Sequence, residues 1–190
     1  MSRALSASYR SALIRLASSL PEGSPERKAI LAGLILTSGI SLREFNIRGV
    51  HILDNAKVQG NAKVQDNAKV YENAKVQNNA WVFGYAQVYG NAWVAIRAWV
   101  YDHAKVFDDA WVKGNAMVNG DAQVFEHAQV LEGAKVKGNA KVYGRAVVAG
   151  QALVYGEARI GGKAVILGGE WNGSEGEILS GTWLAPGVPT

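Results

Sequence analysis

The chain has 190 residues, of which 48% are hydrophobic and 19% are charged, a composition that excludes a fully disordered protein. It contains no cysteine, which excludes disulfides and thiolate zinc sites. The net charge of +4 arises in residues 1–50, which hold seven Lys/Arg and three Asp/Glu and leave thirteen of each for residues 51–190. That larger part is neutral, so we expect no nucleic-acid partner. No apolar run reaches the roughly 18 residues of a membrane span, so none is expected.

Residues 1–40 have the pattern of two amphipathic helices separated by the Pro21–Gly23 break. Ser24, Pro25 and Glu26 form a helix start, with a capping hydroxyl, a first-turn proline and an acid at the positive end. Two helices alone cannot bury their apolar stripe, so we predict a hairpin that docks onto a larger assembly. A cleaved transit peptide and a membrane-surface helix are the alternatives. The predicted anchor residues are Leu5, Tyr9, Leu13, Leu16, Leu20, Ile30, Leu31 and Leu34.

A six-residue repeat governs the next segment. From Ile52 to Ile166 a branched aliphatic residue returns at every sixth position, and from Ala56 to Ala164 alanine does the same, two residues ahead of an aliphatic residue. A spacing of two places both side chains on one face of a strand and their neighbours on the other. The remaining positions are mostly Gly, Asp, Asn, Glu or His, which suit tight corners. Each hexad therefore predicts one strand and one corner, and three hexads would make one turn of a stack.

Residues 52–168 resemble the left-handed parallel β-helix of hexapeptide-repeat proteins, in which an aliphatic residue is followed four places later by a small one, as Val58 is by Ala62. The resemblance implies an all-β solenoid, specifically a left-handed parallel β-helix, which would follow the short N-terminal α-helical hairpin predicted from residues 1–40. Members of that family include trimeric acyltransferases and zinc-dependent γ-class carbonic anhydrases. The uninterrupted Asn-Ala-Trp-Val and Asn-Ala-Lys-Val hexads are more similar to structural repeats of phage and bacterial polymer-forming proteins. Residues 16–28 also resemble a leader on virion proteins of large tailed bacteriophages.

The repeat is interrupted at Glu170 and Asn172, after which Ile178 and Leu184 are expected back in phase. We predict a distorted last coil and a C-terminal cap, with Trp171 and Trp183 as lids. The predicted organisation is a hairpin anchor over 1–40, a connector and N-terminal cap over 41–51, the hexapeptide-repeat β-helix over 52–168, and the last coil and cap over 169–190.

Catalytic chemistry has few candidate residues. His51, His103 and His127 are the only imidazoles, and a catalytic zinc takes three protein ligands. His103 and His127 are one turn plus one hexad apart, so they should lie on different corners. No loop interrupts the hexads, which leaves little concavity for coenzyme A. We therefore predict no catalytic residue, no cofactor and no metal site, with an acyltransferase or γ-class carbonic anhydrase-like enzyme as the alternative.

Outward positions three hexads apart should lie above one another, and one such column is aromatic. It either stabilises neighbouring strands, at about 0.2–1 kcal/mol per pair, or forms a platform for carbohydrate or another protein. We call this column the aromatic ladder; its members are Tyr71, Tyr89, Phe107, Phe125 and Tyr143.

Two neighbouring faces of the middle and upper coils also carry apolar side chains outward. Because exposed tryptophan is enriched at interfaces, we predict a homotrimer around the edge that these faces share. A sheet surface packed only on itself is the alternative. The predicted interface residues are Trp81, Phe83, Trp93, Trp99, Tyr101, Trp111, Val147, Leu153 and Val165.

These features predict a non-enzymatic structural protein. It would be a trimeric β-helical shaft, anchored through its N-terminal helices to a larger assembly such as a phage virion, as a decoration or fibre protein. A virion location is expected, with the cytoplasm as the alternative. A carbohydrate-binding module that uses the aromatic ladder is a further alternative, besides the enzyme.

Overall fold

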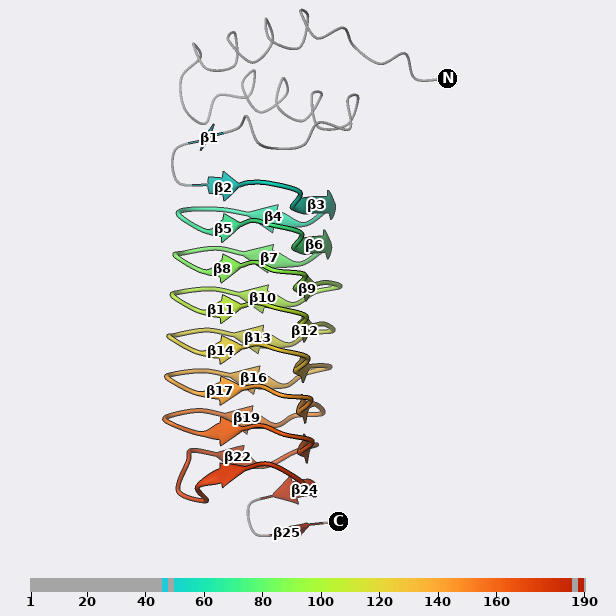
Figure 1. The fold of residues 1–190 in the computed structure, drawn as a ribbon, viewed down its shortest axis with the longest axis vertical. Coiled ribbons are helices and arrows are strands. Elements are labelled where there is room, and N and C mark those ends of the chain that lie inside the picture. The colour runs from blue at the N-terminus through green and yellow to red at the C-terminus, as the bar shows by residue number, and fades with distance from the viewer. Residues whose placement is uncertain (1–45, 48–49, 186–187, 190) are drawn as a thin grey trace, which may run out of the picture. The chain divides into compact units, whose positions relative to one another are not determined.

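The computed structural model describes residues 46–47, 50–185 and 188–189. The hairpin and anchor side chains predicted over residues 1–40 lie outside these residues. The described part of the chain is an all-β parallel solenoid of about seven turns and contains no helix. It accordingly includes no helix long and apolar enough to cross a membrane. Figure 1 shows the coils stacked on one another from β2 (Val50–Ile52) to β24 (Thr182–Ala185).

The strands form three sheets, numbered here in the order in which each turn visits them. Sheet I contains β1 (Asn46–Ile47), β2, β5 (Lys69–Val70), β8 (Gln87–Val88), β11 (Lys105–Val106), β14 (Gln123–Val124), β17 (Lys141–Val142), β20 (Arg159–Ile160) and β23 (Glu177–Ile178). Sheet II contains β3 (Lys57–Gly60), β6 (Lys75–Asn78), β9 (Trp93–Val94), β12 (Trp111–Val112), β15 (Gln129–Val130), β18 (Val147–Val148), β21 (Val165–Ile166), β24 and β25 (Val188–Pro189). Sheet III contains β4 (Lys63–Val64), β7 (Trp81–Val82), β10 (Trp99–Val100), β13 (Met117–Val118), β16 (Lys135–Val136), β19 (Leu153–Val154) and β22 (Glu170–Trp171).

The core consists of the valines and alanines of the repeat. Strands one turn apart pair in parallel with a register of three hexads, so that Lys105 aligns with Gln123 and Val106 with Val124. From Ala68 onward nearly all of these inward side chains have no exposed surface, and no polar side chain of the described residues is buried with them. Each buried valine contributes about 1.5–3 kcal/mol. The predicted alternation of inward and outward positions is confirmed.

Each regular corner contains one residue in the left-handed region of backbone space, at every sixth position from Asp54 to Gly162. The corner is closed by the N–H of the next inward alanine, as when Ala104 donates to the Tyr101 carbonyl at 3.3 Å. Gly, Asn and Asp adopt this conformation at least cost, which explains their recurrence there. Ile96, with φ of 71°, is the β-branched exception.

At the C-terminal end of sheets II and III, one inward residue lies one position earlier in the sequence than a spacing of three hexads predicts. Trp171 aligns with Val154 and Trp183 with Ile166, so the register falls one position short of three full hexads. Trp171 is 1% exposed, and its ring lies edge-on to that of Trp183, with centroids 5.9 Å apart. The two predicted lids therefore point inward at the C-terminal end of the core.

The phase predicted after this shift is correct at one position and wrong at another. Ile178 aligns with Ile160 and is buried, as expected. Leu184 is 52% exposed, because the shortened turn brings Trp183 into the inward position that the six-residue count assigns to Leu184.

Candidate functional site

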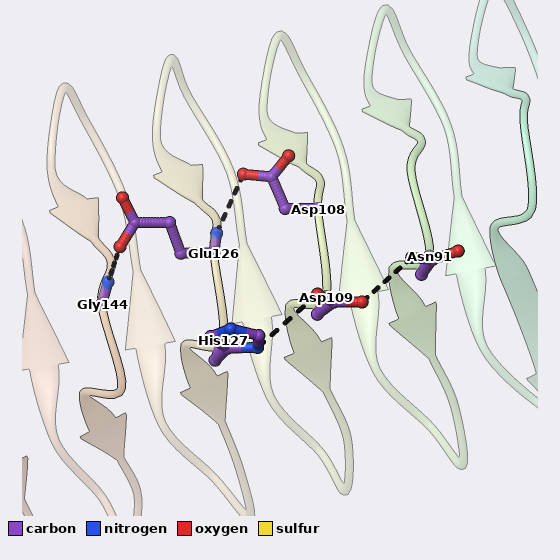
Figure 2. A network of polar contacts seen from close by, with 6 residues as sticks. All are labelled: Asn91, Asp108, Asp109, Glu126, His127 and Gly144. Carbon is purple, nitrogen blue, oxygen red and sulfur yellow. Dashed lines mark hydrogen bonds and ion pairs between the residues drawn. The ribbon is translucent and has the colours of Figure 1, made fainter.

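The links from sheet I to sheet II form a column that we call corner I–II, and a hollow of about 670 Å³ runs along it. Figure 2 shows six of its residues in successive turns. Each turn contributes the left-handed residue and the residue after it. The lining consists of Gly90, Asn91, Asp108, Asp109, Glu126, His127, Gly144, Arg145, Gly162 and Lys163.

Carboxylates at the left-handed positions bind the backbone of the next turn. The Asp108 carboxylate accepts from the Glu126 N–H at 3.2 Å, and the Glu126 carboxylate accepts from the Gly144 N–H at 2.7 Å (Figure 2). Glu72 makes the same bond to the Gly90 N–H at 2.7 Å. These acids therefore satisfy outward-pointing backbone donors of the corner. Sequence reasoning missed this role of the acids in binding backbone N–H groups. Its signal in the sequence is an acid at a left-handed position, three hexads before the residue whose N–H it accepts.

The residues that follow the left-handed positions form a second polar row. The Asn91 amide donates to the Asp109 carboxylate at 3.0 Å, and His127 Nδ1 lies 3.6 Å from the other oxygen of the same carboxylate (Figure 2). Arg145 and Lys163 continue the row over the next two turns and are exposed. Neither of these two side chains has a hydrogen bond or ion pair with any described residue.

The aromatic ladder follows sheet I beside this corner. Consecutive rings stack with centroids 4.8–5.3 Å apart and planes within 10°. Both faces of Tyr89, Phe107 and Phe125 are therefore covered by neighbouring rings, and a sugar bound there would meet ring edges. The stacking that the register predicts is present, and the carbohydrate platform stays a prediction.

Tyr143 ends the ladder beside Gly161, at which an added Cβ would lie 2.4 Å from the tyrosine ring. Its hydroxyl donates to the Glu177 carboxylate. Burial, and after it this hydrogen bond, raises the pKa of Tyr143 to about 12. The phenol therefore remains protonated and acts as a donor that links two turns.

The predicted interface residues lie on two adjacent sheets, as expected from the register. Trp81 and Trp99 stack on sheet III at 5.5 Å, and Phe83 and Tyr101 stack beside them at 4.9 Å. Sheet II carries Trp93 and Trp111, and the upper turns carry Val147 and Val165 on sheet II and Leu153 on sheet III.

Lys113 lies between the two tryptophans of sheet II. Its Nζ is 3.8 Å from the ring centroid of Trp93 and 3.5 Å from that of Trp111, a cation–π arrangement. Burial lowers the pKa of Lys113. The indole N–H of Trp93 is buried without a hydrogen-bond partner among the described residues. The predicted interface did not include Lys113, because only apolar side chains were assigned to it.

The exposed part of this apolar surface centres on the corner from sheet II to sheet III. Trp111 is 39% exposed on one side and Trp99 is 37% exposed on the other. Ile96, on the corner that follows β9, is 47% exposed and has the strained left-handed conformation. We call Ile96, Trp93, Trp99 and Trp111 the tryptophan edge.

The three histidines lie apart from one another. His51 is in β2, His103 stacks on Tyr85 at the corner from sheet III to sheet I, and His127 is on corner I–II. His103 and His127 thus occupy different corners, as predicted. No group of three or more His, Asp or Glu side chains within the described residues has the geometry to hold a metal ion.

Comparison of the chain with protein-family models, curated proteins and solved structures finds no match.

Proposed function

We propose that this chain is a non-enzymatic structural protein, a homotrimeric shaft anchored through residues 1–40 to a larger assembly such as a phage virion. The observation that carries the proposal is the tryptophan edge on an otherwise uninterrupted solenoid. The resemblance of residues 52–168 to left-handed hexapeptide-repeat proteins, and that of residues 16–28 to a virion leader, support it.

The tryptophan edge favours a second copy of the chain as its cover. The left-handed conformation costs a β-branched residue about 1–2 kcal/mol. Ile96 adopts this conformation although it is 47% exposed, so little packing within the chain offsets the strain. Strained residues of this kind concentrate at functional positions. Burying Ile96 with the flanking Trp99 and Trp111 against the same edge of other copies would offset the strain, and three copies around one axis satisfy closed symmetry.

The double substitution of Trp93 and Trp99 by serine should convert the oligomer into a monomer. Each indole at the centre of an interface contributes about 2 kcal/mol or more, so the association constant should fall at least about a thousandfold for the pair. Light scattering should then give the mass of one chain, 20.3 kDa. Tyr85→Ser is the matched control, because Tyr85 is 56% exposed on a different corner and should leave the mass unchanged. A double variant that keeps the wild-type mass would place the interface elsewhere.

Removal of residues 1–40 should abolish docking to the larger assembly and leave the solenoid folded. The predicted anchor side chains are all in that segment, whereas the core valines and alanines all follow it. Co-sedimentation with particles from the natural source measures docking, and circular dichroism measures folding. If the truncated chain still sediments with the particles, the anchor lies elsewhere and this part of the proposal fails.

A further inference from the structure

Corner I–II contains a backbone donor whose usual partner is missing. On this corner the N–H of a left-handed residue is bound by an acid one turn below, as Gly144 is by Glu126 at 2.7 Å. Gly162 is the next left-handed residue, but the position below it is Gly144, which has no side chain, and the Gly162 N–H has no acceptor among the described residues. The Asp108 N–H, above Gly90, has the same gap, but the carboxylate of Asp108 itself disfavours an anion there. At Gly162 a carboxylate-binding position is thus built and left without the chain's own carboxylate.

The charges around this donor favour an anion. Arg145 and Lys163 directly follow Gly144 and Gly162, so the two cations flank the Gly162 N–H in consecutive turns. Both are exposed and have no side-chain partner among the described residues. The acid at the left-handed position one turn below Gly144, Glu126, is already bound to the Gly144 N–H. An incoming anion would therefore meet one neutral donor and two unpaired cations.

The rest of the hollow favours an extended, hydroxyl-bearing ligand over a single small ion. The lining spans four turn-to-turn steps, about 19 Å at the usual strand spacing of about 4.8 Å, with a volume of about 670 Å³. Below the cations it presents His127, the Asp109 carboxylate and the Asn91 amide, groups that bind hydroxyls. Cations at one end and hydroxyl partners along the remainder match an acidic oligosaccharide.

We propose that corner I–II binds an acidic glycan, with the carboxylate of one sugar held by Arg145, Lys163 and the Gly162 N–H. A carboxylate is favoured over a phosphate because Asp and Glu carboxylates already occupy the equivalent position in other turns of this corner. The site does not depend on the oligomeric state or on the anchor, so it can fail or succeed independently of the function proposed above.

The test is isothermal titration of the full chain with the α-1,4-linked trimer of galacturonate, and with its methyl ester as the uncharged control. The trimer should bind and the ester should bind at least about tenfold more weakly, because charged hydrogen bonds are the strong ones. Arg145→Gln and Lys163→Gln should each weaken binding of the acid about tenfold or more. Arg97→Gln removes an exposed arginine from the corner between sheets II and III and should leave the affinity unchanged.

Four results with the galacturonate trimer and the variants would overturn the proposal. These are no heat of binding with the galacturonate trimer, equal affinity for its ester, unchanged affinity in both corner I–II variants, and an equal loss in Arg97→Gln. Glycerol phosphate is the arm for the other oxyanion source, and tighter binding of it than of the galacturonate trimer would overturn the assignment to an acidic sugar. Circular dichroism of each variant excludes unfolding as the cause of lost binding.

Discussion

Val106→Asp is expected to prevent folding of the solenoid. The Val106 side chain has no exposed surface, lies in the central strand β11, and is surrounded by alanine and valine with no buried polar partner among the described residues. A carboxylate placed there would be desolvated without compensation, at a cost of several kcal/mol. That cost is comparable to the whole stability of a typical domain. Far-UV circular dichroism and urea denaturation measure the loss.

Lys105→Asp is the matched control for this substitution. It introduces the same side chain one residue earlier, at a position that faces outward beside Gln87 and Gln123. Lys105→Asp should change the free energy of unfolding by no more than about 0.5 kcal/mol, as is usual for surface substitutions. If Val106→Asp kept the urea midpoint of the wild-type chain, the inward assignment of the repeat valines would be wrong.

Gly114→Ala is expected to cost about 3 kcal/mol in the free energy of unfolding. Gly114 has φ of 81°, and a Cβ there would lie 2.8 Å from the backbone nitrogen of Glu132 in the next turn. Backbone cannot move aside as the tip of a side chain can, so the two turns would have to separate locally. Urea denaturation with an unchanged slope would show the loss directly.

The position one turn below should respond in the opposite direction. Ile96→Gly removes a β-branched residue from the same left-handed conformation and should stabilise the chain by about 1 kcal/mol. The measurement is best made in the Trp93→Ser, Trp99→Ser background, where loss of an interface contact cannot mask the gain. Destabilisation by Ile96→Gly in that background would show that the strain is compensated within one chain.

The regular part of the fold could be predicted from the sequence because its period is constant. A fixed six-residue spacing determines which side chains point inward, and three hexads per turn determine which outward residues stack. The neighbours in the aromatic ladder and in the Trp81–Trp99 and Trp93–Trp111 pairs follow from that count. The count does not give the ring geometry, and the rings of Trp93 and Trp111 meet edge-on, at 76°. Each turn repeats the environment of the one below, so an assignment made at one valine applies to the others.

The prediction from sequence failed where the number of residues per turn changes. It also failed where a side chain hydrogen-bonds to the backbone of the next turn. In the last turn the spacing between inward residues is not constant, so Ile178 keeps its phase while Trp183 displaces Leu184 from the inward position. Counting from the regular hexads could not show this difference. The sequence identifies the acids of corner I–II only as turn residues, because their bonds depend on the direction of an N–H in the left-handed conformation. The sequence shows the two cations Arg145 and Lys163. It does not show that the Gly162 N–H between them lacks an acceptor among the described residues.

The buried alanines and valines of this molecule recur in every hexad, whereas residues on the same outward face recur only after a full turn of three hexads. The interior and the surface therefore have different periods. Insertion of a whole turn would lengthen the column and leave each face as it is. Insertion of a single hexad would also preserve every alanine and valine contact, yet it would rotate everything above by one third of a revolution. The aromatic ladder would then continue onto a different side of the column. Gain or loss of one hexad therefore changes, in steps of one third of a revolution, the direction in which the later outward side chains point relative to the earlier ones. The buried core changes little.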